Sequence, residues 1–163
     1  MAAWQFDLHL LPTSTIVRRY GVVPIFISSE DFDSTNWWSS NVTVDCLATE
    51  FSAILPPLRS WSSNLRMWGE DDGNRVDVGF RDDSITEIFV RVDVRVLSTV
   101  FLTGIVKIAR QHYLKVRPSN GRLLSPTLRQ LMEEIHSSPA FRFVKDPAAY
   151  LTALEHATHS EEE

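Results

Sequence analysis

Hydrophobic and polar positions alternate strictly in two parts of the chain. Between Trp4 and Leu11, four hydrophobic residues share one face, which is typical of a half-buried strand. Between about residues 64 and 96, the alternation recurs in three segments separated by turn-type residues at 70–73 and 81–84. These segments predict a three-stranded antiparallel meander with one face on a core: Val76, Val78, Phe80, Ile88, Val90, Val92, Val94 and Val96.

Helical spacing of hydrophobic residues predicts helices over about 44–55, 97–116, 125–137 and 146–156. The helix at 97–116 is the most apolar and is expected to be central. Residues 139–144 are expected to be extended, and the tail 157–163 to be frayed. The order of elements predicts a single α+β domain over 1–163, with the meander packed against the long helix and C-terminal helices.

The charge balance changes the range of functions to consider. The net charge is −5 and the isoelectric point is about 5.5, which argues against nucleic-acid binding. Cys46 is the single cysteine, and the run 96–106 is about half the roughly 20 residues that a membrane span needs. We therefore expect a soluble cytoplasmic protein with neither a nucleic-acid nor a membrane partner.

The polar face of the meander is dense in charge, and two interpretations compete for it. Asp77, Glu87 and Asp93 would make a metal-assisted hydrolase if they converged on a divalent ion. However, each acid has an arginine within a few residues and the stretch 65–95 contains no lysine, so cross-strand ion pairing is favoured. The residues on this face are Arg75, Asp77, Glu87, Arg91, Asp93 and Arg95. We predict no metal and no cofactor.

The remaining reactive side chains give no catalytic motif. His156 and His159 are three residues apart, but they fall where fraying is expected. Cys46 lies beside a hydrophobic helix stripe and is predicted to be a buried structural cysteine. Neither a phosphate-binding glycine motif nor a nucleophile elbow is present in the sequence.

The aromatic residues suggest a binding surface. Trp37 and Trp38 are adjacent, so they are not expected to face inward together from one extended segment. Trp68 alternates with Arg66 and is predicted to lie on the charged side, while Phe89 lies in the charged row and needs cover from another element or a partner. Aromatic residues among arginines and acids are typical of protein-binding hot spots, although tryptophans that cover core edges fit the same pattern.

The size, the acidity and the layout "LPPLRSW…MWGEDDG…VRVDVR" resemble those of the small acidic orphan α+β proteins that bacteria make as immunity proteins against toxins. The resemblance implies a non-catalytic protein that covers the active site of a basic cognate toxin or effector. Alternatives are the metal-assisted hydrolase and a homo-oligomeric structural protein that pairs through strand 85–96 or the tryptophan loop 32–41. The predicted partner-binding residues are Trp68, Glu70, Asp71, Asp72, Asp77, Phe89, Arg91, Asp93 and Arg95.

Overall fold

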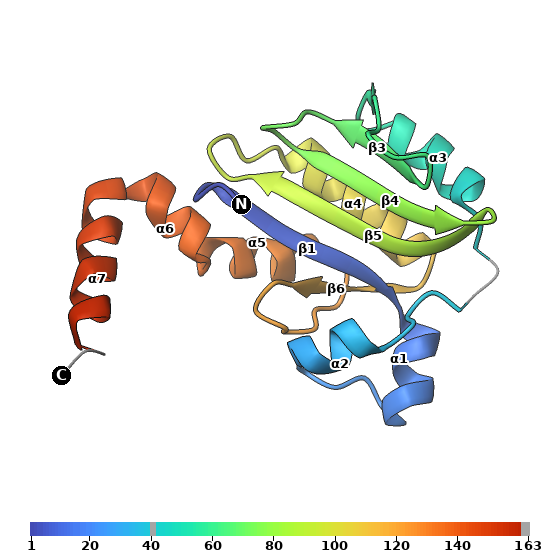
Figure 1. The fold of residues 1–163 in the computed structure, drawn as a ribbon, viewed down its shortest axis with the longest axis horizontal. Helices are drawn as coiled ribbons and strands as arrows, with labels where there is room; N and C mark the ends of the chain where they lie inside the picture. The colour runs from blue at the N-terminus through green and yellow to red at the C-terminus, as the bar shows by residue number, and fades with distance from the viewer. Residues whose placement is uncertain (40–41, 161–163) are drawn as a thin grey trace.

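The fold is α+β and is built on one antiparallel sheet, as predicted. The computed structural model describes residues 1–39 and 42–160, and within them the strand order is β2-β3-β4-β5-β1-β6 (Figure 1). The strands are β1 (Gln5–Pro12), β2 (Pro57–Leu58), β3 (Leu65–Gly69), β4 (Arg75–Arg81), β5 (Ser84–Asp93) and β6 (Leu114–Pro118). The helices are α1 (Thr13–Tyr20), α2 (Ser29–Ser34), α3 (Val44–Ser52), α4 (Thr99–Gln111), α5 (Leu128–His136), α6 (Pro139–Lys145) and α7 (Pro147–Ser160).

Strand β1 is the first strand in the chain, yet it lies between β5 and β6. Phe6 pairs with Val92 and Leu8 with Val90, so the apolar residues of β1 continue the apolar face of β5. Leu8 and Val90 are fully buried. The period-two pattern therefore places these two strands in one register, because a slip by one residue would turn every apolar side chain toward water.

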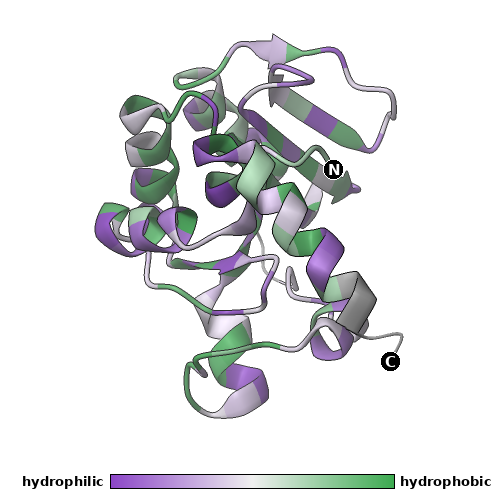
Figure 2. Ribbon diagram, turned by 90° about the vertical axis from the view of Figure 1, so that its left-hand side faces the viewer, coloured by the Kyte–Doolittle hydropathy of each residue, from purple (hydrophilic) through white to green (hydrophobic). Residues whose placement is uncertain are grey.

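The hydrophobic core lies between one face of the sheet and the helices α3 and α4. Figure 1 shows α4 behind β4 and β5, and Figure 2 views these layers from the side, with a column of helices to the left of the strands. Gly104 of α4 lies against Ile54, where an added Cβ would be 2.7 Å from a methyl carbon. None of the described helices is both long enough and apolar enough to cross a membrane.

The prediction for Trp68 was wrong, because Trp68 faces the core rather than the charged side. In the β3–β4 register, Trp68 is opposite Val76, and its side chain is 2 % exposed. Its indole Nε1 donates to Ser52 Oγ at 2.9 Å, and its ring lies 5.4 Å from that of Phe51. Alternation alone does not show which face is buried in a five-residue strand where Trp68 shares its face with an arginine, and the Arg66 side chain indeed remains exposed.

Three other local predictions were also wrong. Trp37 and Trp38 are both buried, because Trp37 packs between the rings of Tyr20 and Phe32. The predicted helix 97–116 is shorter, since α4 ends at Gln111 and β6 begins at Leu114. Residues 139–145 form α6 instead of an extended segment, because Ser138 Oγ accepts from the backbone N–H of Phe141 and caps the helix.

Three further expectations concern Val96, Cys46 and the tail. Val96 was predicted on the core face, but it is 73 % exposed because β5 ends at Asp93. Cys46 is exposed rather than buried, on the outward side of α3. Helix α7 continues to Ser160, although fraying was expected from residue 157. Residues 161–163 and the end of the tryptophan loop, residues 40–41, lie outside the described residues.

Trp68→Ala is expected to lower the free energy of unfolding by about 3–5 kcal/mol, because it leaves a cavity beside Phe51. Urea denaturation followed by circular dichroism measures this change. Trp61→Ala is the matched control, since Trp61 is 82 % exposed and its loss should change stability by less than about 0.5 kcal/mol. Equal effects of the two substitutions would contradict the placement of Trp68.

Candidate binding surface

The side of β4, β5 and β1 that faces away from α4 is here termed the outer face. Register places Asp77 opposite Phe89, and Arg91 between Arg75 and Asp7. At the His9 end, α2 covers this face, with the Phe32 ring 4.7 Å from the His9 ring. The side chains of the outer face are those of Asp7, His9, Arg75, Asp77, Glu87, Phe89, Arg91 and Asp93.

The carboxylates of the outer face all have a cationic or histidine partner. Arg91 Nε donates to Asp7 Oδ1 at 3.0 Å across the β5–β1 pair, and both side chains are largely buried. The other contacts are Arg75 to Asp77 at 3.0 Å, Arg95 to Asp93 at 2.9 Å and His9 to Glu87 at 2.7 Å. The carboxylates of the outer face therefore form a lattice of contacts with neighbouring arginine and histidine side chains.

Phe89 occupies the centre of this lattice and is half-buried. Its ring meets the His9 ring edge-on at 5.4 Å, and the Arg91 guanidinium lies 5.4 Å from its centroid. The cover that the sequence required for Phe89 thus comes in part from its own neighbours. Phe89 remains within the predicted partner surface as a partly accessible side chain.

The turn between β3 and β4 carries Glu70, Asp71 and Asp72, here termed the acidic turn. All three side chains are exposed, and none forms an ion pair with another described residue. The bend requires a left-handed residue at Gly69 (φ 108°), where a Cβ would lie 2.0 Å from the Asn74 carbonyl oxygen. The acidic turn therefore differs from the outer face, because its carboxylates form no ion pair with a described residue, although the Arg95 guanidinium attracts Asp72 at longer range.

Arg95 fixes the acidic turn to the end of β5. Its Nη2 donates to the backbone oxygen of Asp72 at 2.9 Å, and its Nε donates to Asp93 Oδ1 at 3.0 Å. The guanidinium also stacks on the Trp4 ring at 4.5 Å. Three chain segments thus meet at this arginine, which holds the backbone of the acidic turn in place.

Burial and pairing shift two carboxyl groups of the outer face in opposite directions. Burial raises the pKa of Asp77, and the neighbouring Arg75 offsets part of that rise. The hydrogen bond from His9 lowers the pKa of Glu87, although burial works against it. Ionised Asp77 is therefore a net cost to the folded state near neutral pH, whereas ionised Glu87 is stabilised.

The three carboxylates of the hydrolase alternative do not converge on one site. Asp77, Glu87 and Asp93 are each held by a different partner side chain. Within residues 1–39 and 42–160, no group of three His, Cys, Asp or Glu side chains is placed to hold a metal. His156 is exposed on α7, and the side chain of His159 lies outside the described residues.

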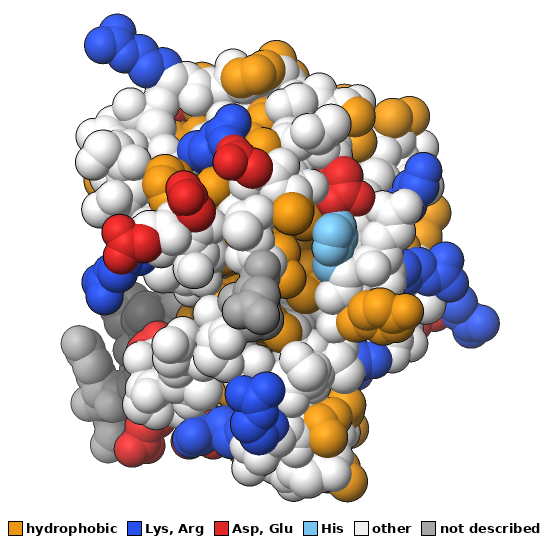
Figure 3. Space-filling view, turned by 90° about the vertical axis from the view of Figure 1, so that its right-hand side faces the viewer, with side chains coloured by type: hydrophobic (Ala, Val, Ile, Leu, Met, Phe, Trp, Pro, Cys, Tyr) orange, Lys and Arg blue, Asp and Glu red, His pale blue; other side chains and the backbone are white. Residues whose placement is uncertain are grey.

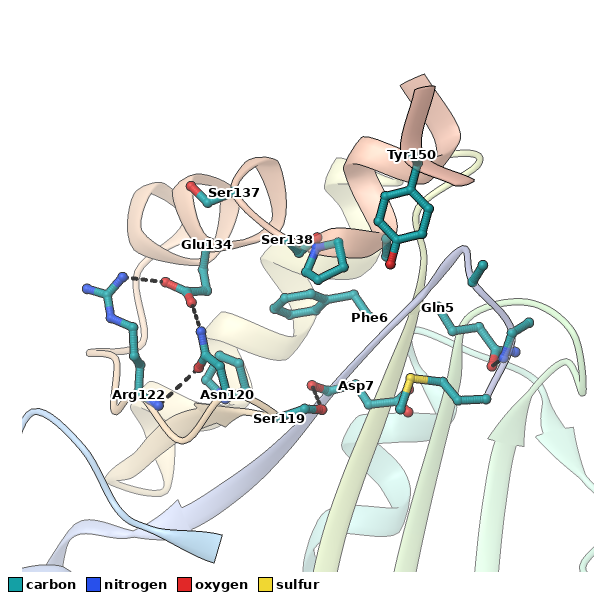
Figure 4. A pocket seen from close by; sticks show the side chains of 16 residues that line it. Gln5, Phe6, Asp7, Ser119, Asn120, Arg122, Glu134, Ser137, Ser138 and Tyr150 are labelled. Carbon is teal, nitrogen blue, oxygen red and sulfur yellow. Dashed lines mark hydrogen bonds and ion pairs between the residues drawn. The ribbon is translucent and has the colours of Figure 1, made fainter. Parts of the chain in front are cut away.

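A pocket of about 400 Å³, here termed the end pocket, lies beside the start of β1 and was missed by sequence reasoning. Figure 4 shows Phe6 at its centre, with Glu134, Asn120 and Arg122 joined on one side and the Tyr150 ring on the other. Glu134 is 7 % exposed, although it is a carboxylate. A sequence signal existed, because Glu134 occupies the buried stripe of α5 between Leu131 and Ile135.

The acidic turn and the end pocket lie at the same end of the molecule. In Figure 1, the β3–β4 turn, the loop after β5, the start of β1 and the α6–α7 pair all gather on the left. At the opposite end, Figure 3 shows hydrophobic side chains between charges of both signs. The acidic end therefore combines the exposed carboxylates of the acidic turn with a concave site.

No protein family, curated protein or solved structure matches this chain. The resemblance to immunity proteins consequently rests on the sequence layout alone.

The raised pKa of Asp77 predicts how stability varies with pH. Protonated Asp77 stabilises the folded state below the unfolded pKa of about 3.8, and this contribution is lost as pH rises through the higher folded value. From pH 7 down to about 4, the wild type should gain stability relative to Asp77→Asn, by at most about 1.4 kcal/mol per pH unit. Urea denaturation of both proteins across this range tests the slope; a flat or opposite trend would contradict it.

Proposed function

We propose that this chain is a non-catalytic protein-binding module whose partner presents a basic surface to the acidic turn. The observation that supports this proposal is the contrast between acidic side chains that form ion pairs within the fold and those that do not. The acids of the outer face form ion pairs within the fold, whereas Glu70, Asp71 and Asp72 form none with a described residue, although Arg95 attracts Asp72 at longer range. An immunity-type inhibitor that covers a basic toxin in the cytoplasm is the specific form of this function.

The geometry supports rapid and specific association. Exposed carboxylates of one sign attract a basic partner over a Debye length of roughly 8 Å in physiological salt. The backbone of the acidic turn is already held by Arg95, so little ordering free energy is needed on binding. Phe89, Arg91 and the rest of the outer face lie on the neighbouring strands β4, β5 and β1, while Trp68 is buried in the core.

The paired carboxylates also weigh against the hydrolase alternative. A general base or a metal ligand needs accessible lone pairs, and Asp77 and Asp93 direct theirs at arginines. The homo-oligomeric alternative predicts instead that the chain captures only itself.

The double substitution Asp71→Lys/Asp72→Lys should lower partner capture by at least about tenfold, because like charges across an interface cost several kcal/mol. Tagged wild type and variant are compared in pull-downs from the native host lysate at low and high salt, with captured proteins identified by mass spectrometry. The expected partner has a basic isoelectric point, and its capture by the wild type weakens as salt rises.

Glu30→Lys/Glu133→Lys is the matched control, since both side chains are exposed and the change in net charge is the same. Circular dichroism of both variants checks that they remain folded. Equal loss of capture in both variants, or capture of an acidic protein, would argue against the acidic turn as the contact. Capture of the chain alone would favour the homo-oligomer.

A further inference from the structure

We infer that the end pocket receives an arginine side chain of the basic partner, and this inference rests on the proposed function. The pocket is a separate concave site at the acidic end. Its volume of about 400 Å³ is sufficient for a long side chain. Its lining combines apolar walls with a buried carboxylate, the combination that an arginine stem and head require.

The walls of the end pocket match the aliphatic stem and the flat guanidinium of an arginine. Phe6, Pro118 and Pro139 are apolar lining residues, and the Tyr150 ring projects from α7 (Figure 4). The Tyr150 ring meets the Phe143 ring edge-on at 5.8 Å and lines the pocket. A guanidinium stacked on this ring would gain a cation–π contact, and a tyrosine hydroxyl oxygen can accept a hydrogen bond.

Glu134 supplies the acceptors for the guanidinium head. Asn120 Nδ2 donates to Glu134 Oε1 at 2.5 Å, and Arg122 Nη1 donates to Glu134 Oε2 at 2.9 Å. A carboxylate offers about four lone-pair sites, so each oxygen keeps about one site for another donor. Two parallel N–H groups of a guanidinium match two such oxygens, whereas a lysine ammonium is a point charge without that fork.

Glu134 is the carboxylate of the lining that a cation would meet. Asp7 also lines the end pocket, but Arg91 holds its carboxylate in an ion pair, and Arg122 is the ion-pair partner of Glu134. Arg122 is 63 % exposed, so much of its charge is solvated outside the pocket. The acidic turn at the same end adds further attraction. A neutral apolar ligand would leave the remaining acceptors of Glu134 unpaired, at a cost in desolvation.

The test uses N-acetyl-arginine amide as the probe and the full chain as the receptor. Titration is followed by two-dimensional ¹H–¹⁵N NMR, with the neutral isostere N-acetyl-citrulline amide as the matched control. The expected result is a saturable shift of the signals of Phe6, Asn120 and Tyr150 with the arginine probe. Citrulline should bind at least about tenfold more weakly, because it loses the charge-assisted hydrogen bonds.

Two variants separate the parts of the site. Glu134→Gln should weaken the arginine probe by about tenfold, since it removes the charge of the acceptor. Tyr150→Ala should weaken binding of the arginine probe by several fold. Because Tyr150 lies on α7 outside the core, this variant is expected to fold. It therefore tests the site even if Glu134→Gln proves unstable. Neither variant changes the acidic turn.

The outcomes distinguish this inference from the proposed function. Equal binding of arginine and citrulline, or the absence of saturable shifts at the end pocket, would overturn the arginine site. Shifts confined to residues 70–72 would also overturn it, while they would leave the acidic turn as the contact with a basic partner. Loss of partner capture in the acidic-turn variant together with intact arginine binding at the pocket would support both.

Discussion

The pairing of β1 with β5 is the constraint on which the rest of the structure depends. It joins the first strand of the chain to the centre of the sheet, and it carries the buried contact between Asp7 and Arg91. Removing either partner would leave a charge with little access to water, which is costly. The same pairing sets Trp4 under Arg95 and Phe6 in the lining of the end pocket. The acidic end is therefore a product of sheet register rather than of a local motif.

Sequence patterning predicted the features that depend on period alone. The alternation around Val76 and Val90 identified the core face, and it identified Arg75, Asp77, Arg91 and Asp93 as the opposite row. The pattern did not predict which face of a short strand is buried, nor features that depend on contacts between residues far apart in the sequence. Trp68 shares a strand face with the exposed Arg66, yet it is buried because α3 supplies Phe51 and Ser52, which are remote in sequence. The end pocket needed four segments together, and only the misplaced carboxylate of Glu134 pointed to it.

The two kinds of charge at the surface have different physical consequences. On the outer face, the contacts of Asp7 with Arg91 and of His9 with Glu87 join β1 to β5, whereas the Arg75–Asp77 pair lies within β4. The side chains of the acidic turn are exposed and form no ion pair with a described residue, so they contribute little to folding. Exposed like charges repel one another weakly in the free protein, and a basic partner would relieve that repulsion. The side chains that stabilise the fold and those proposed to bind the partner are thus adjacent but separate sets of charged residues.

The most direct test of a binding surface at the acidic end is site-specific photo-cross-linking in the native host. A photoreactive amino acid replaces Val96, which is 73 % exposed and shares a small hollow with Glu70 and Asp93. In a control variant of the same chain, the photoreactive amino acid replaces Val22, which is 67 % exposed between α1 and α2. The account predicts one discrete adduct with a basic protein from position 96 and none from position 22. An adduct from position 22 alone, or no adduct from position 96, would contradict it.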